Sequence, residues 1–228
     1  MDIVCLGHSS FKLANKTAVV VTDPFDPAMV GLKFPKLDNV SIVTVSHDHP
    51  DHNFLNNLPE EEKFVVNGPG EYEIGGVMVN GIATFHDDEK GAKRGKNVVY
   101  TITMDGVRVC HLGDLGHKLT DEQVQKIGSV NVLLVPVGGF YTIDSQIASE
   151  VVVQLEPNIV IPMHYKQSLR SSPSAAGLNS AIYDKTFGQL DTVDKFLKEM
   201  GVESLAPQAK LVTSLEKLPE TTTVVVLE

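Results

Sequence analysis

Short runs of apolar residues, separated by turn residues, fill the first half of the chain. Most of these runs have the length of a strand and are bounded by Gly, Pro, Asn or Asp. The strands expected from them are residues 3–6, 11–13, 18–22, 41–45, 64–66, 72–74 and 77–83. Gly75-Gly76 separates the last two runs and predicts a tight hairpin, and residues 54–58 predict a short helix.

The second half alternates apolar runs with segments of helical periodicity. Thr120-Asp121-Glu122-Gln123 is a capping box for a helix that Gly128 ends, and the apolar faces of residues 144–155 and 191–200 predict two more helices. Asp105-Gly106 predicts a second hairpin. The strands expected here are residues 98–104, 107–112, 130–137, 158–163, 210–213 and 223–227. Strands followed by strands mixed with helices favour two sheets flanked by helices.

Composition excludes several classes of protein. The apolar runs are far shorter than the roughly 18 residues of a membrane helix, and no basic segment precedes an apolar one at the N-terminus, so neither a membrane span nor a secretory signal is expected. Cys5 and Cys110 lie inside apolar runs, which is typical of buried thiols in the cytoplasm. Residues 168–180, rich in Ser, Ala, Gly and Pro, predict a surface loop.

The charge of the chain is strongly acidic. Nineteen Lys and Arg face 29 Asp and Glu, which gives a formal net charge of −10. Such a chain repels nucleic acid and anionic membranes at long range, so neither is expected as a bulk partner. The chain also carries eight histidines, and their distribution is the most informative feature of the composition.

Three histidines and two aspartates occur together in His47-Asp48-His49-Pro50-Asp51-His52. This segment directly follows the strand expected at residues 41–45. Residues two apart in an extended segment share a side, so His47 and His49 can bind one cation together. The turn at Pro50 then directs Asp51 and His52 to a neighbouring position. Imidazole with carboxylate suits Zn, Mn or Fe, whereas Ca and Mg prefer oxygen donors. The segment therefore predicts a metal site rather than a solvated loop.

This segment resembles the HxHxDH signature of the metallo-β-lactamase-fold hydrolases. Three more motifs follow in the order of that family, each just after an expected strand: His86 in Thr84-Phe85-His86-Asp87, Asp114 in His111-Leu112-Gly113-Asp114, and His164 in Pro162-Met163-His164-Tyr165. The resemblance extends over residues 1–166. It implies an α+β fold, a four-layer αββα sandwich, as a single domain over residues 1–228 with a two-metal site at one edge.

Further segments resemble the small hydrolases related to ascorbate-6-phosphate lactonase. They are Gly7-His8-Ser9-Ser10-Phe11, Arg94-Gly95-Lys96-Asn97, Gly113-Asp114-Leu115-Gly116-His117 and Pro136-Val137-Gly138-Gly139. Residues 168–190 are longer than the usual connection in this group. We interpret them either as a lid or as a contact between copies in a homo-oligomer.

The resemblance implies a role for seven residues as metal ligands. His47, His49 and His86 hold one ion, Asp51, His52 and His164 hold the second, and Asp114 bridges the two. Two divalent ions are expected, with Zn as the first choice and Mn or Fe as alternatives. Asp51 is also the candidate catalytic residue, because it can orient the attacking water and return a proton to the leaving group.

Four other residues are candidates for contact with a substrate. His8 resembles a family position near the pocket, with a role toward the substrate or in support of the ligands. Arg94 belongs to a basic segment after His86 that either binds an anion or is a solvated loop, since acidic residues nearly balance its charge. Tyr141 is either a pocket wall or an ordinary loop aromatic, and His117 supports the site without binding metal. His111 is expected to be structural.

The resemblance implies hydrolysis of a small ester, lactone or phosphorylated metabolite. Two alternatives remain open: a phosphodiesterase acting on a nucleotide or phospholipid head group, and a redox or non-catalytic metal protein on the same scaffold. The presence of His52 argues against the redox protein. Two divalent ions would outweigh the negative groups around them, so a small anionic substrate is expected despite the acidic chain.

Overall fold

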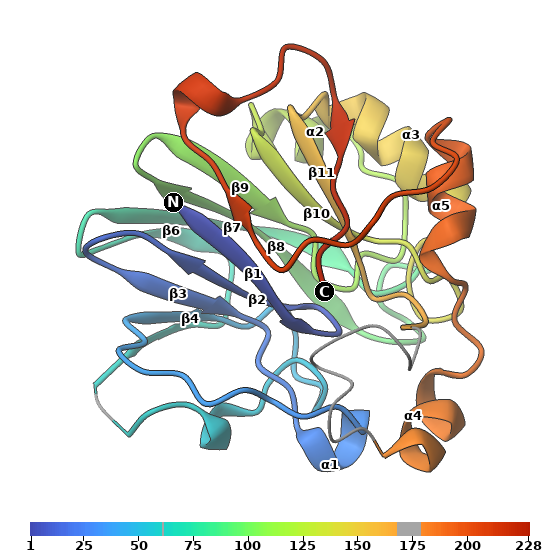
Figure 1. The fold of residues 1–228 in the computed structure, drawn as a ribbon, viewed down its shortest axis with the longest axis horizontal. Coiled ribbons are helices and arrows are strands. Elements are labelled where there is room, and N and C mark those ends of the chain that lie inside the picture. The colour runs from blue at the N-terminus through green and yellow to red at the C-terminus, as the bar shows by residue number, and fades with distance from the viewer. Residues whose placement is uncertain (61, 168–178) are drawn as a thin grey trace.

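Two mixed β-sheets with helices on their outer faces make up the fold (Figure 1). The computed structural model describes residues 1–60, 62–167 and 179–228. The first sheet has the strand order β12-β1-β2-β3-β4-β5, with β1 Asp2–Gly7, β2 Ser10–Ala14, β3 Val19–Thr22, β4 Ile42–Thr44, β5 Phe64–Val66 and β12 Leu211–Val212. The second has the order β13-β11-β10-β9-β8-β7-β6, with β6 Gly70–Ile74, β7 Val77–Phe85, β8 Lys96–Met104, β9 Val107–His111, β10 Val132–Pro136, β11 Ile159–Met163 and β13 Thr223–Val224.

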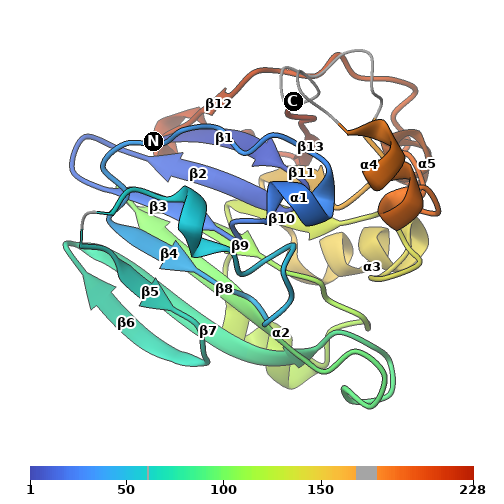
Figure 2. The ribbon, with the colours of Figure 1, turned by 90° about the horizontal axis from the view of Figure 1, so that it is seen from below.

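The helices cover both outer faces of this pair of sheets (Figure 2). They are α1 Pro27–Val30, α2 Asp121–Ile127, α3 Ser145–Leu155, α4 Ser180–Phe187 and α5 Val193–Glu199, with 3-10 turns at Leu55–Asn57 and Leu215–Lys217. Helices α2, α3 and α5 pack on the second sheet, whereas α1 and α4 pack on the first. A third apolar core lies between the two sheets and includes Phe11, Tyr100 and Ile161. The expected four-layer αββα sandwich is confirmed.

Local sequence signals account for most boundaries. The Thr120 hydroxyl accepts from Gln123 N–H at 3.2 Å and the Gln123 side chain accepts from Thr120 N–H at 3.0 Å, so the expected capping box begins α2. Asp105 and Gly106 both have positive φ, 50° and 79°, as a two-residue hairpin turn requires. The strong local signals therefore act as predicted.

Two helices differ from the expectation. Helix α1 is a single turn, with Pro27 at its first position and Asp26 accepting from Ala28 N–H at 2.9 Å. Helix α4 begins at Ser180, where the sequence predicts the end of a loop. Its signal in the sequence is weak, because only Tyr183 and Phe187 give it a buried face. The rest of the expected loop, residues 168–178, lies outside the described residues. The helix expected at residues 54–58 is a 3-10 turn.

Strand direction places many loops at one edge of the sandwich. Strands β1 and β3 are both antiparallel to β2, and β4 is parallel to β3, so these three end on the same side. In the second sheet β7 and β9 are both antiparallel to β8, and β9, β10 and β11 are parallel. The loops that follow β1, β3, β4, β7, β9 and β11 therefore gather where the chemistry-bearing residues lie.

The described residues contain no helix long and apolar enough to cross a membrane.

Candidate metal centre

Six loops at this edge contribute histidine and aspartate side chains to one cluster. All are buried except His49, which is half-buried because it lies toward the cavity. The cluster consists of His8 after β1, Asp23 after β3, His47, His49, Asp51 and His52 after β4, His86 after β7, Asp114 after β9 and His164 after β11.

The first ligand group, as we name it, consists of His47, His49 and His86. One ring nitrogen from each lies within 4.8 Å of the others, a spacing at which a single ion can be held. The ring centroids of His47 and His49 are 4.5 Å apart, and those of His47 and His86 are 4.7 Å apart. The structure thus brings together the three histidines that the sequence assigns to one ion.

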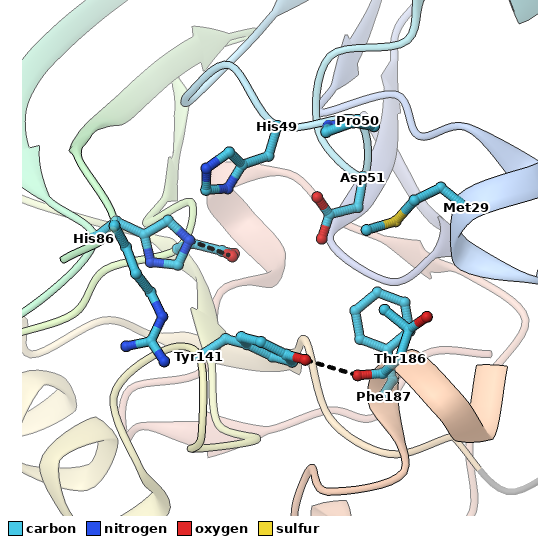
Figure 3. A pocket seen from close by; sticks show the side chains of 10 residues that line it. Met29, His49, Pro50, Asp51, His86, Tyr141, Thr186 and Phe187 are labelled. Atoms are coloured by element: carbon cyan, nitrogen blue, oxygen red, sulfur yellow. Dashed lines mark hydrogen bonds and ion pairs between the residues drawn. The ribbon is translucent and has the colours of Figure 1, made fainter. Parts of the chain in front are cut away.

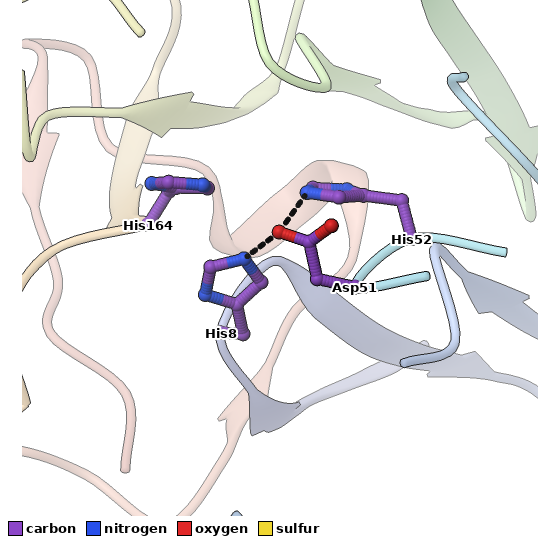
Figure 4. A group of neighbouring side chains, drawn as sticks. All are labelled: His8, Asp51, His52 and His164. Carbon is purple, nitrogen blue, oxygen red and sulfur yellow. Dashed lines mark ion pairs between the residues drawn. The ribbon is translucent and has the colours of Figure 1, made fainter. Parts of the chain in front are cut away.

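The second ligand group consists of Asp51, His52, His164 and His8 (Figure 4). The Asp51 carboxylate lies between two of the imidazoles, with Oδ2 3.3 Å from His8 Nε2 and 3.6 Å from His52 Nε2. The sequence assigns three of these residues to the second ion. His8, which the sequence places near the substrate or behind the ligands, lies among them.

Asp114 lies between the two ligand groups. Its Oδ2 is 3.2 Å from His86 Nε2 of the first group and 3.2 Å from His164 Nε2 of the second. Its Oδ1 is 3.3 Å from His52 Nε2. One carboxylate therefore reaches histidines of both ligand groups.

Asn97 and Gly113 hold the Asp114 loop in place. The side-chain oxygen of Asn97, Oδ1, accepts from Asp114 N–H at 3.0 Å. Its side-chain Nδ2 donates to Thr84 Oγ1 at 2.8 Å and to Leu112 O at 2.9 Å. Gly113 has φ of 56°, and a Cβ there would collide with Asn97 Oδ1 and Ser46 Cβ. A side chain at position 113 would therefore displace Asp114 from the ligand groups.

Asp23 supports the ligands from behind, a role that the sequence did not reveal. Its Oδ2 accepts from the Ser46 hydroxyl at 2.5 Å and faces His52 Nδ1 at 2.8 Å, and its Oδ1 accepts from Ser46 N–H at 2.8 Å. The Asp23 carboxylate can only accept, so His52 Nδ1 carries a proton, and Nε2 is the nitrogen directed toward Asp51 and Asp114. In the sequence Asp23-Pro24 indicates only a turn after a strand.

Burial sets the protonation of several ligands. It lowers the pKa of His8 to about 4 and that of His47 to about 3, with His164 and His52 respectively adding to the effect, so both imidazoles are neutral. Burial alone would raise the pKa of Asp51, but His52 and His8 hold it below its usual range. Burial likewise opposes the charge on His52, yet Asp114 and Asp51 raise its pKa well above the usual value. Neutral imidazoles and ionised carboxylates are the forms that bind metal.

Several buried nitrogen and oxygen atoms of the cluster make no hydrogen bond within the described part of the chain and are free to bind a metal ion. His8 Nε2, His47 Nε2, His52 Nε2 and Asp114 Oδ1 are buried and have no hydrogen-bond partner among the described residues, and buried polar atoms are rarely left so. The donors of a tetrahedral zinc site lie about 3.4 Å apart, given bonds of about 2.1 Å. The Asp114 contacts of 3.2–3.3 Å match that spacing. The cluster is therefore able to hold metal ions.

A cavity of about 320 Å³ opens beside the ligand groups (Figure 3). Arg94 and Tyr141 both line it, together with Met29, His49, Pro50, Asp51, His86, Asp114, Thr186 and Phe187. The Arg94 guanidinium donates to Phe140 O at 2.9 Å and lies 5.8 Å from the centroid of the Tyr141 ring. The Tyr141 hydroxyl donates to Thr186 O at 2.8 Å, so this residue forms a wall rather than a free donor.

The two remaining histidines use their ring nitrogens on the backbone. His111 Nε2 lies 2.8 Å from Ser9 O, and its Nδ1 accepts from Gly113 N–H at 3.1 Å. His117 Nδ1 lies 2.8 Å from Lys118 O, and its Nε2 accepts from Phe85 N–H at 3.2 Å. His117 is not among the residues that line the cavity. Both rings act on the loops that carry Asp114 and His86.

Comparison with known proteins gives a consistent set of relatives. A family described as "Beta-lactamase superfamily domain" matches residues 2–164. A UPF0173 metal-dependent hydrolase from Thermoplasma acidophilum is 31% identical over 189 residues, which cover 72% of this chain and 83% of the relative. A solved structure from Thermotoga maritima, described as a candidate Zn-dependent hydrolase of the metallo-β-lactamase superfamily, is 37% identical with a TM-score of 0.76 and covers 100% of this chain and 98% of its own. Igni18, a metallo hydrolase from Ignicoccus hospitalis, shares the fold at 19% identity, with a TM-score of 0.62 and coverage of 93% and 99%.

Proposed function

The chain belongs to the beta-lactamase superfamily and is a metal-dependent hydrolase, and from this premise we propose that it hydrolyses a small anionic ester, lactone or phosphorylated metabolite with two divalent metal ions. The two ligand groups support the number of ions, because each offers at least three donors and Asp114 contacts both. When bound, such ions lower the pKa of water and polarise the bond to be cleaved.

Asp51 supplies the acid–base chemistry of the protein in this proposal. It is ionised, it lines the cavity and it lies between His8 and His52. An ionised carboxylate there accepts a hydrogen bond from the attacking water and so orients it. The proton released from that water passes through Asp51 to the leaving group.

Arg94 carries the argument for an anionic substrate. The neighbouring acidic residues do not neutralise it, because they have other partners. Asp87 accepts from the backbone N–H groups of residues 89, 91, 93 and 94, while Asp88 and Glu89 form ion pairs with Lys93 at 3.9 and 2.7 Å. The guanidinium is thus left to face the cavity, where its planar set of donors suits a carboxylate or phosphate.

The size of the cavity favours a small metabolite over a phosphodiester with two large groups. A volume of about 320 Å³ lies at the lower end of the range for ligand sites. Apart from Arg94 and the metal ligands, its walls are mainly apolar, formed by Met29, Tyr141 and Phe187. A substrate with one anionic group and a compact apolar body fits this lining.

A substrate panel tests the proposal. Protein loaded with Zn, Mn or Fe is assayed on aryl esters, on lactones with and without a phosphate group, and on bis(p-nitrophenyl) phosphate. We expect turnover of the esters or lactones. Among the lactones, the one that carries the phosphate group should be preferred. The absence of turnover with every metal, in protein that binds metal, would contradict a hydrolase of these substrates. Turnover of the phosphodiester alone would instead favour the phosphodiesterase.

Two variants separate binding from chemistry in the same assay. Arg94→Gln should raise KM for the anionic substrate by about 10–100-fold and leave the neutral analogue unchanged, since one charge-assisted contact is lost. Asp51→Asn should lower kcat on both substrates. An equal effect of Arg94→Gln on the charged and neutral substrates would contradict its assigned role.

A further inference from the structure

We propose that His8 is a protein ligand of the ion held by the second ligand group, so that this ion is enclosed by protein and the ion of the first ligand group meets the substrate. The inference rests on the two ions of the proposed function. It changes the second position from the three residues expected there, Asp51, His52 and His164, to four, with Asp114 as a fifth donor at the boundary.

The His8 ring is directed toward the other members of the second ligand group. Its Nε2 points into the second ligand group (Figure 4) and lies 3.3 Å from Asp51 Oδ2. That separation matches the spacing of neighbouring donors around one ion. The same nitrogen is buried and has no hydrogen-bond partner within residues 1–60, 62–167 and 179–228, which leaves its lone pair for an ion.

The backbone around His8 is built to hold the ring there. His8 has φ of 55° and His164 has φ of 52°, a conformation that costs free energy for residues other than glycine. The two residues are linked directly, because His164 N–H donates to His8 O at 3.3 Å. Their ring centroids are 4.2 Å apart. The ends of β1 and β11, from opposite sheets, thus present two strained histidines to one point.

Phe187 covers the second ligand group on the cavity side. Its ring centroid lies 4.6 Å from that of His8 and 6.2 Å from that of His164. The first ligand group is more open, since His49 is half-buried and lines both the main cavity and a neighbouring hollow with Arg94 and Lys96. A substrate therefore reaches the first position without displacing protein, whereas Phe187 covers the His8 and His164 side of the second position and leaves Asp51 at the cavity.

The donor count has a consequence for the choice of metal. Three imidazoles and two carboxylates exceed the four donors of a typical structural zinc site, whereas Mn, Fe and Co accept more. The first position has fewer protein donors, His47, His49, His86 and Asp114, so a zinc ion there can take water or substrate as a fifth ligand. The second position should therefore favour Mn, Fe or Co over Zn more strongly than the first does.

The experiment compares metal binding in wild type, His8→Ala and His8→Gln. Gln can still hydrogen-bond to Asp51 but is a poor ligand, so it separates ligation from the positioning of Asp51. Asp48→Asn is the control, because Asp48 lies at the same edge of the sandwich but is exposed and belongs to neither ligand group. Ions are counted by elemental analysis, affinities come from chelator competition, and Co²⁺-loaded protein is examined by absorption and by NMR of paramagnetically shifted ring N–H signals.

We expect both His8 variants to bind the second Co²⁺ more than about 100-fold more weakly, beyond the 10–100-fold typical of an outer partner. The first ion should keep its affinity, and Asp48→Asn should keep both. Wild type should show a shifted ring N–H signal that assignment places on His8. Because this signal is measured in wild type, the test holds even if a variant fails to fold.

Two results would overturn the inference. Normal binding of the second ion by His8→Gln would show that His8 only positions Asp51, and a wild-type spectrum without a shifted His8 signal would exclude ligation. In both cases two bound ions and hydrolysis leave the proposed function intact. Wild type that binds no ion, by contrast, would remove the proposed function and this inference together.

Discussion

Replacement of Asp23 by Asn should weaken metal binding by the second ligand group, although Asp23 itself is not a member of that group. Three donors face the Asp23 carboxylate: Ser46 N–H on Oδ1, and the Ser46 hydroxyl and His52 Nδ1–H on Oδ2. An amide offers only one acceptor oxygen. If its NH₂ group faces His52, the ring must carry its proton on Nε2, and that nitrogen can then no longer bind metal. If the NH₂ group faces Ser46 N–H, two donors oppose each other.

The magnitude follows from the position of Asp23. Loss of a partner behind a metal-binding histidine typically costs 10–100-fold in metal affinity, or about 1.4–2.7 kcal/mol. Asp23 is fully buried, and the variant also removes its charge, so the larger figure is expected for the ion bound to His52. The first ligand group should change less, because the Ser46 hydroxyl lies between Asp23 and His47 Nδ1, at 2.5 and 2.9 Å, whereas His52 Nδ1 faces Asp23 directly.

Chelator competition with Asp23→Asn and a matched control measures this effect. Asp48→Asn removes a carboxylate from the same motif, but Asp48 is exposed, and its one hydrogen bond in the described part of the chain is from Asn53 Nδ2 at 2.9 Å. The control should stay within about 2-fold of wild type. Unchanged affinity for both ions in correctly folded Asp23→Asn would refute the reasoning, since the tautomer of His52 would then not depend on Asp23.

Three further predictions concern the same edge of the sandwich. Gly113→Ala should lower the free energy of unfolding by about 2–4 kcal/mol and weaken metal binding, because the positive φ and collisions with Asn97 and Ser46 oppose the methyl group. Thermal unfolding of the metal-free protein measures the loss of stability, and an unchanged Tm would contradict this prediction. Metal affinity should rise with pH up to the raised pKa of His52, by about tenfold per unit for one released proton, since the protonated ring cannot bind; a pH-independent affinity by competition titration would exclude this coupling. Removal of the ions with a chelator should abolish hydrolysis and lower Tm, because ions bind the folded site; added Zn or Mn should restore both, and activity that survives complete removal would contradict metal dependence.

Much of the candidate site could be predicted because its signals are local. His47, His49, Asp51 and His52 lie in six consecutive residues after a strand, so alternation and one turn are enough to divide them between two positions. The structure groups them in that division. The fold could be predicted from strand-length apolar runs and two hairpin signals for the same reason. The sequence does not predict helix α4, because only Tyr183 and Phe187 form its buried face and its apolar periodicity is therefore short.

The elements, the order of the motifs and the residue types that can bind metal follow from the sequence. Which distant side chains meet depends on how the two sheets pack. His8 and His164 are separated by most of the chain, and they touch because two sheets pack with the ends of β1 and β11 at one edge. The same holds for Asp23 behind His52, and for the acidic neighbours of Arg94, whose partners leave it facing the cavity. Local patterns set backbone conformation, whereas hydrogen bonds and contacts between elements depend on a packing that no short segment contains.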